Sequence, residues 1–271
     1  LENGANSSFV NRMADEAVSV DDLVQCPVQR LHAEAAQTDR GLGHPHPHIP
    51  LPAALYGAAR TNSTGPDLAH EPTLRQLAAY MSADCEPLHV EPLLAKTALA
   101  VSAAPETLPI VNPADHSDVL GTVRHASAAE VSAALQAATD FDPTWAAVPP
   151  TQRAALLEQA AHLLQADTPR AMALLVREAG KTWAHAVAEV REAVDFLRYY
   201  AAQVRRDFDP ATHRPLGPVV CISPWNFPLA IFLGQVSAAL AAGNTVLAKP
   251  AEATPAIAAL AVRLLWQAGV P

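Results

Sequence analysis

The sequence predicts an α/β fold that contains a parallel sheet. Over residues 218–266, short apolar runs alternate with longer apolar helical segments in the order strand, helix, strand, helix. Short joints between such segments are typical of a βαβ unit, whose strands lie parallel. Half of the 271 residues are hydrophobic, which is enough to bury a sizeable core and argues against disorder.

Charge and cysteine usage exclude several classes of function. Asp and Glu outnumber Lys and Arg by 27 to 18, and the net charge of −9 disfavours broad binding to a phosphate backbone. The three cysteines, at 26, 85 and 221, form no close pair and no metal-site spacing, so we expect a reducing compartment and no metal. The chain opens without a basic-then-apolar leader, and its most apolar run is shorter than the ~20 residues that a bilayer requires. We expect a cytoplasmic protein.

The N-terminal 105 residues divide into two zones of different composition. Residues 1–28 are polar and weakly helical, and Asp21 and Asp22 can cap a short helix. Residues 29–105 are rich in proline and alanine, and four prolines within residues 43–52 favour an extended polyproline path over a helix. We expect this second zone to be a connector that lies over a surface.

Residues 106–271 show clearer periodicity, which begins with a turn and a strand. The run Asn112–Asp115 is typical of a turn, and a short apolar strand follows over residues 119–123. Leucine and alanine then recur at three- and four-residue intervals over 156–164, which predicts a helix with one buried face.

Two further helices are expected before the βαβ unit. Asp167, Thr168 and Pro169 form a cap with proline at the first helical position, and Gly180 interrupts the helix that follows. Apolar residues then fall on one stripe over residues 187–201, which predicts a long helix.

The βαβ unit closes the sequence and supplies a candidate site. We expect strands over residues 218–222 and 245–248, and helices over residues 227–242 and 254–266. In open α/β sheets, ligands bind beyond the carboxyl ends of the parallel strands. Six residues directly follow the two strands and are expected to line that edge: Ser223, Pro224, Trp225, Asn226, Lys249 and Glu252.

Lys249 and Glu252 suit the ribose of a nucleotide that lies across this edge beside Trp225. A carboxylate accepts hydrogen bonds from ribose hydroxyls, and an ammonium donates to them. The alternative is that the two residues form only an ion pair where a helix begins, which contributes little to stability.

Two motifs at this edge resemble those of the aldehyde dehydrogenase superfamily. PWNFP at residues 224–228 and AAGNTVLAKPAE at residues 241–252 have the order and spacing found in that family. The resemblance implies an aldehyde-dehydrogenase-like NAD-binding domain with a Rossmann-like parallel sheet and several N-terminal helices. It also implies that Asn226 donates its amide to the oxyanion of a thiohemiacetal, and that Lys249 and Glu252 hold the adenosine ribose of NAD.

Four segments are similar to the bifunctional proline utilization A family. Residues 1–12 resemble the closing helix of its proline dehydrogenase barrel, and residues 49–68 resemble the connector that follows. Residues 189–201 and 217–232 resemble its glutamate semialdehyde dehydrogenase domain.

This resemblance implies a domain organisation and two activities in the parent protein. Residues 1–28 are expected to form the C-terminal end of the flavin barrel, and residues 29–105 the connector between the two domains. Residues 106–271 are expected to form the N-terminal part of the aldehyde dehydrogenase domain. The parent would oxidise proline to pyrroline-5-carboxylate with FAD, and then glutamate semialdehyde to glutamate with NAD. The family's catalytic cysteine and general-base glutamate fall outside this sequence, so we expect the 271 residues alone to be inactive.

The same resemblance implies small-molecule substrates, a homo-oligomer and peripheral membrane association of the parent, and it leaves DNA binding open. Two other functions stay open as well. The first is a monofunctional NAD-dependent aldehyde dehydrogenase of another substrate class, and the second is a non-catalytic nucleotide-binding piece.

Several residues imitate functional motifs. Cys221 lies within a predicted strand, so we expect a buried thiol and not a nucleophile, which requires an electropositive, accessible setting. Residues 180–182 imitate the end of a phosphate-binding loop, but Leu175 occupies the position of its first glycine. Trp145 and Arg153 recur in aldehyde dehydrogenases, and we expect both to serve packing. Alternating histidines at 44, 46 and 48 are expected to be solvated and not to bind metal.

Overall fold

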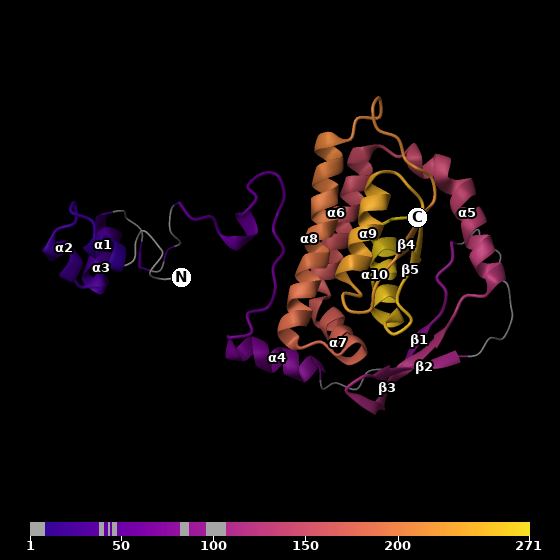
Figure 1. Ribbon diagram of the computed structural model, residues 1–271, viewed down its shortest axis with the longest axis horizontal. Helices are drawn as coiled ribbons and strands as arrows, with labels where there is room; N and C mark the ends of the chain where they lie inside the picture. Colours follow the sequence, from indigo (N-terminus) through magenta and orange to yellow (C-terminus); the bar gives the residue numbers. More distant parts are fainter. Residues whose placement is uncertain (1–8, 38–40, 43, 45–47, 82–86, 96–106) are drawn as a thin grey trace. The chain divides into compact units, whose positions relative to one another are not determined.

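Figure 1 shows the computed structural model of the chain. It describes residues 9–37, 41–42, 44, 48–81, 87–95 and 107–271. The chain divides into two compact units, Leu1–Leu51 and Pro52–Pro271.

In the described residues of the first unit there are three short helices, none of whose residues is buried. They are α1 (Phe9–Met13), α2 (Val20–Val24) and α3 (Pro27–Gln37). The predicted short helix is present as α2, but the predicted cap is wrong. The Ser19 hydroxyl caps it by accepting a hydrogen bond from the Asp22 backbone N–H at 3.1 Å, and Asp21 and Asp22 lie in the first helical turn. A serine at this position is favoured because its side chain reaches an N–H that has no partner within the helix.

The zone expected to be a connector contributes secondary structure to the second unit. It supplies a 3₁₀ turn at Pro52–Ala54, helix α4 (Glu71–Met81) and strand β1 (Leu88–Val90). The predicted polyproline path over residues 43–52 lies partly outside the described residues. The zone therefore differs from a purely extended path over a surface.

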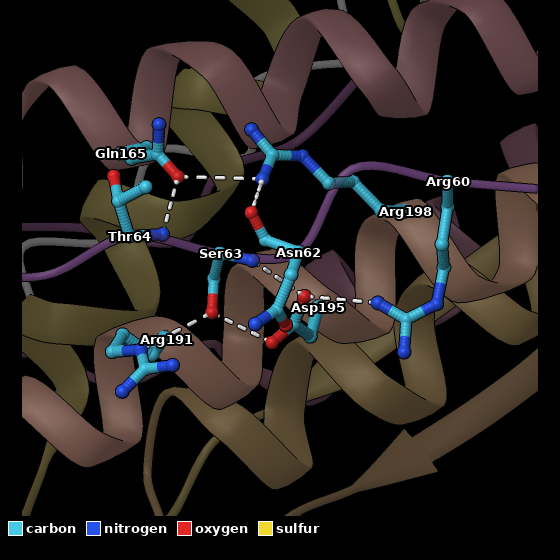
Figure 2. A network of polar contacts seen from close by, with 8 residues as sticks. All are labelled: Arg60, Asn62, Ser63, Thr64, Gln165, Arg191, Asp195 and Arg198. Carbon is cyan, nitrogen blue, oxygen red and sulfur yellow. Dashed lines mark hydrogen bonds and ion pairs between the residues drawn. The ribbon is translucent and has the colours of Figure 1, made fainter. Parts of the chain in front are cut away.

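A polar network fixes residues 60–64 against two long helices, α6 (Pro150–Ala166) and α8 (Trp183–Asp207). Figure 2 shows that Asp195 of α8 lies at its centre. Its carboxylate accepts from the Ser63 N–H at 2.9 Å and the Ser63 hydroxyl at 2.6 Å, and from the Arg60 guanidinium at 3.0 Å. Because Ser63 is only 1% exposed, the two hydrogen bonds that it donates satisfy polar groups that water does not reach.

A second set of contacts in the network joins both helices to the same segment. Arg198 of α8 donates to the Asn62 carbonyl at 3.1 Å and to the Gln165 side-chain oxygen at 3.3 Å. That oxygen also accepts from the Thr64 N–H at 3.0 Å. Residues 60–64 are thus an integral part of the unit (Figure 2).

A three-stranded sheet with the order β1–β3–β2 follows. Strands β2 (Thr107–Asn112) and β3 (Asp115–Arg124) form an antiparallel hairpin, and β1 pairs parallel with β3. The predicted turn at residues 112–115 is confirmed. The predicted strand over residues 119–123 is present but longer, and its two partner strands, β1 and β2, were not predicted.

Helix α5 (Ala128–Ala146) was not predicted. It begins with a capping box, in which the Ser127 hydroxyl accepts from the Glu130 N–H and the Glu130 carboxylate accepts from the Ser127 N–H. Among its residues only Glu130 and Trp145 are buried, so the helix has little apolar periodicity. The Ser-x-x-Glu pattern was the signal that could have located it.

The three predicted helices of the bundle are confirmed as α6, α7 (Thr168–Ala179) and α8. Gly180 ends α7 in the left-handed conformation, with a φ of 65°, which glycine adopts without steric cost. The predicted cap is wrong in detail, because the Asp167 side chain makes no capping hydrogen bond. Fully buried side chains of these helices form the main core: Leu157, Leu164, Met172, Leu175, Val190, Val194 and Leu197.

The predicted βαβ unit is confirmed. Its elements are β4 (Val219–Ile222), α9 (Ala230–Ala241), β5 (Val246–Lys249) and α10 (Pro255–Gln267). The two strands pair parallel, from Val219 opposite Val246 to Ile222 opposite Lys249. Helix α9 packs on α8 and α6, and α10 packs on α6 and α7 (Figure 1).

Two buried glutamates from the bundle cap the helices of the βαβ unit. Neither α9 nor α10 has a side-chain cap of its own. Glu189 of α8 accepts from the backbone N–H groups of Leu229 and Ala230 at 2.9 and 3.3 Å. Glu178 of α7 likewise accepts from two backbone N–H groups in the first turn of α10, those of residues 256 and 257, at 2.6 and 2.9 Å. These carboxylates satisfy donors that every helix start leaves without an internal partner.

We predict that Gly121→Ala lowers the free energy of unfolding by about 2–4 kcal/mol, because overpacking against rigid backbone is costly. A Cβ atom at Gly121 would lie 2.0 Å from the Leu88 carbonyl oxygen of β1. The matched control is Gly57→Ala, since Gly57 also has a positive φ but no heavy atom within 4 Å of the added Cβ. Chemical denaturation of the three proteins measures the difference. Equal losses in both variants would contradict tight packing of β1 on β3.

A second prediction concerns Glu178 and pH. Burial raises the pKa of Glu178 to about 7, against the two backbone hydrogen bonds, which lower it. The folded state then holds this proton more tightly than the unfolded state, so stability falls as pH rises from about 4.5 to 7. The wild-type free energy of unfolding, minus that of Glu178→Gln, should fall by about 3 kcal/mol over this range. Denaturant titrations at several pH values measure it, and a difference that rises with pH would contradict the prediction.

Candidate functional site

The carboxyl ends of β4 and β5 lie side by side, as the βαβ topology requires. Ile222 is paired with Lys249, and the Ser223 N–H donates to the Lys249 carbonyl at 3.1 Å. Ser223 is buried, and its hydroxyl lies 3.5 Å from the Gln235 side-chain oxygen of α9. The backbone ladder therefore continues one residue past β4 and fixes where the next loop begins.

The loop after Ser223 presents its side chains to solvent. Trp225 is 63% exposed, Phe227 is 41% exposed, and Asn226 is also exposed. Pro228 and Leu229 are buried again where the chain enters α9. Asn226 thus lies between a buried strand end and a buried helix start, with its amide accessible to a ligand.

Lys249 and Glu252 form an ion pair at the end of β5. The Lys249 ammonium lies 2.7 Å from a Glu252 carboxylate oxygen, and both side chains are at least half exposed. The hydrogen bond from Lys249 lowers the pKa of Glu252, so its carboxylate is ionised at neutral pH. An exposed pair of this kind adds little stability. It does offer a donor and an acceptor together at the strand ends.

The opposite end of α9 is fixed by the two residues expected to serve packing, Trp145 and Arg153. The indole N–H of Trp145 donates to the Leu240 carbonyl at 3.2 Å, and Arg153 donates to the Ala241 carbonyl at 2.9 Å. Both side chains are almost fully buried, which lowers the pKa of Arg153. These bonds satisfy carbonyls at the C-terminus of α9 and set the turn into β5.

The residues that imitate functional motifs lie outside the strand-end edge or are buried in the core. Cys221 is 4% exposed within the core, and burial raises its pKa, so the expected buried thiol is confirmed. Lys181, from the imitation of a phosphate-binding loop, forms a short ion pair with Glu189. Among the described residues, no group of three or more His, Cys, Asp or Glu side chains could hold a metal ion, and His46 lies outside them. No helix in the described part is long and apolar enough to cross a membrane.

The structure thus gathers the six predicted residues at one sheet edge, and it adds three that sequence reasoning missed. Lys181, Glu189 and Glu178 are charged residues on or beside amphipathic helices, and nothing in their spacing separates them from solvated surface charges. Their burial depends on how the bundle packs against the βαβ unit, which no local pattern contains.

Comparison with known proteins identifies the family. Residues 100–271 match the model of the aldehyde dehydrogenase family. The whole chain is 56% identical to bifunctional protein PutA of Klebsiella aerogenes and 50% identical to that of Rhizobium meliloti. The chain spans about a fifth of the length of these two relatives, 20% and 21%.

Solved structures agree with the sequence comparison. The crystal structure of proline utilization A from Bradyrhizobium japonicum matches all of this chain with 25% of its own, at 41% identity and a TM-score of 0.71. A 1-pyrroline-5-carboxylate dehydrogenase from Thermus with bound NAD matches 83% of this chain and 44% of its own, at 32% identity and a TM-score of 0.71. The predicted aldehyde-dehydrogenase-like fold and the resemblance to PutA are confirmed, and the chain belongs to the aldehyde dehydrogenase family.

Proposed function

We propose that this chain contributes the start of the NAD-binding domain to an enzyme that oxidises glutamate semialdehyde to glutamate in proline catabolism. The observation that carries the proposal is the strand-end edge itself. The exposed Asn226 amide and the Lys249–Glu252 pair lie where an α/β sheet binds its ligand, within the region that matches the family.

The similarity over the N-terminal residues favours a bifunctional parent. PutA proteins match 100% of the chain, whereas the 1-pyrroline-5-carboxylate dehydrogenase of Bacillus cytotoxicus matches 59% of it. We therefore assign residues 1–28 to the end of a proline dehydrogenase domain, residues 29–105 to the connector, and residues 106–271 to the aldehyde dehydrogenase domain. FAD would serve the proline dehydrogenase part, and the parent would be a cytoplasmic homo-oligomer that associates peripherally with membranes.

The residues at the edge fit NAD by the chemistry of their groups. The Glu252 carboxylate can accept from ribose hydroxyls, the Lys249 ammonium can donate to them, and the exposed Trp225 offers an apolar surface beside them. Ser223 and Pro224 complete the rim of the cofactor site by holding the loop at the strand end. When bound, NAD supplies the acceptor for the electron pair removed from the substrate.

Asn226 stabilises charge during the reaction. When a thiolate attacks the aldehyde carbon, the carbonyl oxygen becomes an oxyanion, which the Asn226 amide can stabilise by donating a hydrogen bond. The buried ends of its loop keep the amide in place, so little reorganisation is required when the charge develops. The nucleophile is not Cys221, because that thiol is buried in the core.

We predict that Asn226→Ala in the full-length protein lowers kcat for semialdehyde oxidation by ~10²–10³-fold, the usual effect of removing one oxyanion donor. The KM for NAD should change less than about twofold, because the amide acts on charge that exists only during reaction. Steady-state kinetics, in which one substrate is varied while the other is held in fixed excess, measures both constants. Proline oxidation by the same preparation is the internal control, and a large rise in the KM for NAD with kcat unchanged would contradict the role.

We predict that Glu252→Gln narrows the ratio of kcat/KM for NAD over NADP on the order of fivefold, mainly through better use of NADP. A phosphate at the 2′ position would face the negative charge of Glu252, which the adjacent Lys249 only partly offsets. The matched control is Glu158→Gln, since Glu158 is a partly exposed glutamate paired with Arg205 on the bundle. An unchanged ratio in Glu252→Gln would leave this carboxylate as part of an ion pair alone.

A further inference from the structure

A buried ion pair lies between the helical bundle and the start of α9. The Lys181 ammonium pairs with Glu189, and their side chains are only 11% and 1% exposed. The second carboxylate oxygen of Glu189 accepts from the N–H groups of Leu229 and Ala230. One carboxylate therefore holds both a lysine and the first turn of the helix that follows the Asn226 loop.

The same lysine also contacts the loop directly. The Lys181 ammonium lies 4.3 Å from the centre of the Phe227 ring, within the range of a cation–π interaction. Phe227 directly follows Asn226, and Leu229 comes two residues later. Contacts on Phe227 and Leu229 therefore restrain the chain immediately after the amide, while the hydrogen bond from Ser223 restrains it before.

Lys181 lies in the short connection between α7 and α8, whose two ends are both capped. Gly180 ends α7 in a left-handed conformation, and Thr182 caps α8 by accepting from the His185 N–H at 3.3 Å. The lysine lies between these two caps. Its position is consequently set by the ends of two helices and not by a free loop.

We propose that Lys181 and Glu189 are positioning residues, which hold the loop so that the Asn226 amide meets the developing oxyanion. This inference rests on the role proposed above for Asn226. An oxyanion donor must lie within a few tenths of an ångström of its place, and a misplacement of about 1 Å can cost ~10²-fold in rate. Lys181 contacts the Phe227 ring, and Glu189 accepts hydrogen bonds from the start of α9. Together these contacts restrain the loop.

The test is a double-mutant cycle of Lys181→Met and Asn226→Ala in the full-length protein. Lys181→Met should lower kcat ~10–10²-fold and leave the KM for NAD within about twofold. In the Asn226→Ala background it should have almost no further effect on kcat, because the group it positions is already absent. Variants that merely contain less folded enzyme would lose the same factor in both backgrounds.

The matched control is Arg60→Met. Arg60 is a cation that is 14% exposed and pairs with Asp195 on the same helix as Glu189, but it holds residues 60–64 and not the Asn226 loop. Its kcat should stay within about twofold of wild type. If Lys181→Met does not fold, Phe227→Leu replaces it in the cycle, because that change removes the ring contact and leaves the ion pair.

The outcomes separate this inference from the function on which it rests. If Asn226→Ala leaves kcat unchanged, the proposed role of Asn226 fails. If Asn226→Ala lowers kcat but the second substitution multiplies the loss, Lys181 acts independently of the amide and the positioning role is overturned. A fall in kcat that Lys181→Met causes in the wild-type background, but not in the Asn226→Ala background, supports the positioning role.

Discussion

The backbone N–H groups at the starts of α9 and α10 impose the constraint on which the rest of this domain depends. Both helices begin inside the protein without side-chain caps of their own, and an unsatisfied buried N–H costs about 1–3 kcal/mol. Glu189 and Glu178 remove that cost from neighbouring helices, and a carboxylate also suits the positive end of a helix dipole. The bundle therefore holds the first turns of α9 and α10 in place.

This arrangement separates the groups that stabilise the fold from those available to a ligand. The carboxyl groups of Glu178 and Glu189 that hold the two helices are buried, whereas Lys249, Glu252 and Trp225 are exposed at the strand ends. An exposed ion pair adds little to stability, so the edge can exchange its internal contacts for those of a nucleotide. At the opposite end of α9, Trp145 and Arg153 are buried and donate hydrogen bonds to the backbone carbonyls of Leu240 and Ala241.

Sequence reasoning succeeded where local pattern and tertiary structure agree. The apolar runs of the βαβ unit and the glycine at 180 located strands, helices and a helix end, and the strand-end rule located the edge. The role proposed for Asn226 rests on resemblance alone and stays a prediction, because an exposed amide has no distinguishing pattern. Helix α5 and strand β1 were missed because one is largely exposed and the other is three residues long in a proline-rich zone. Glu178 and Glu189 were missed because burial of a carboxylate is decided by partners distant in sequence.

The contacts of residues 60–64 and β1 bear on how the strand-end edge that carries Asn226, Lys249 and Glu252 could be moved between proteins. Both segments precede the region that matches the family model, yet one is bonded to Asp195 and the other completes the sheet beside Gly121. A graft that began at residue 107 would leave Asp195 without its partners and uncover the backbone of β3. The piece to transfer is the compact unit from Pro52 onward. Within it, the part of the connector that contains residues 60–64 and β1 supports the fold of the domain.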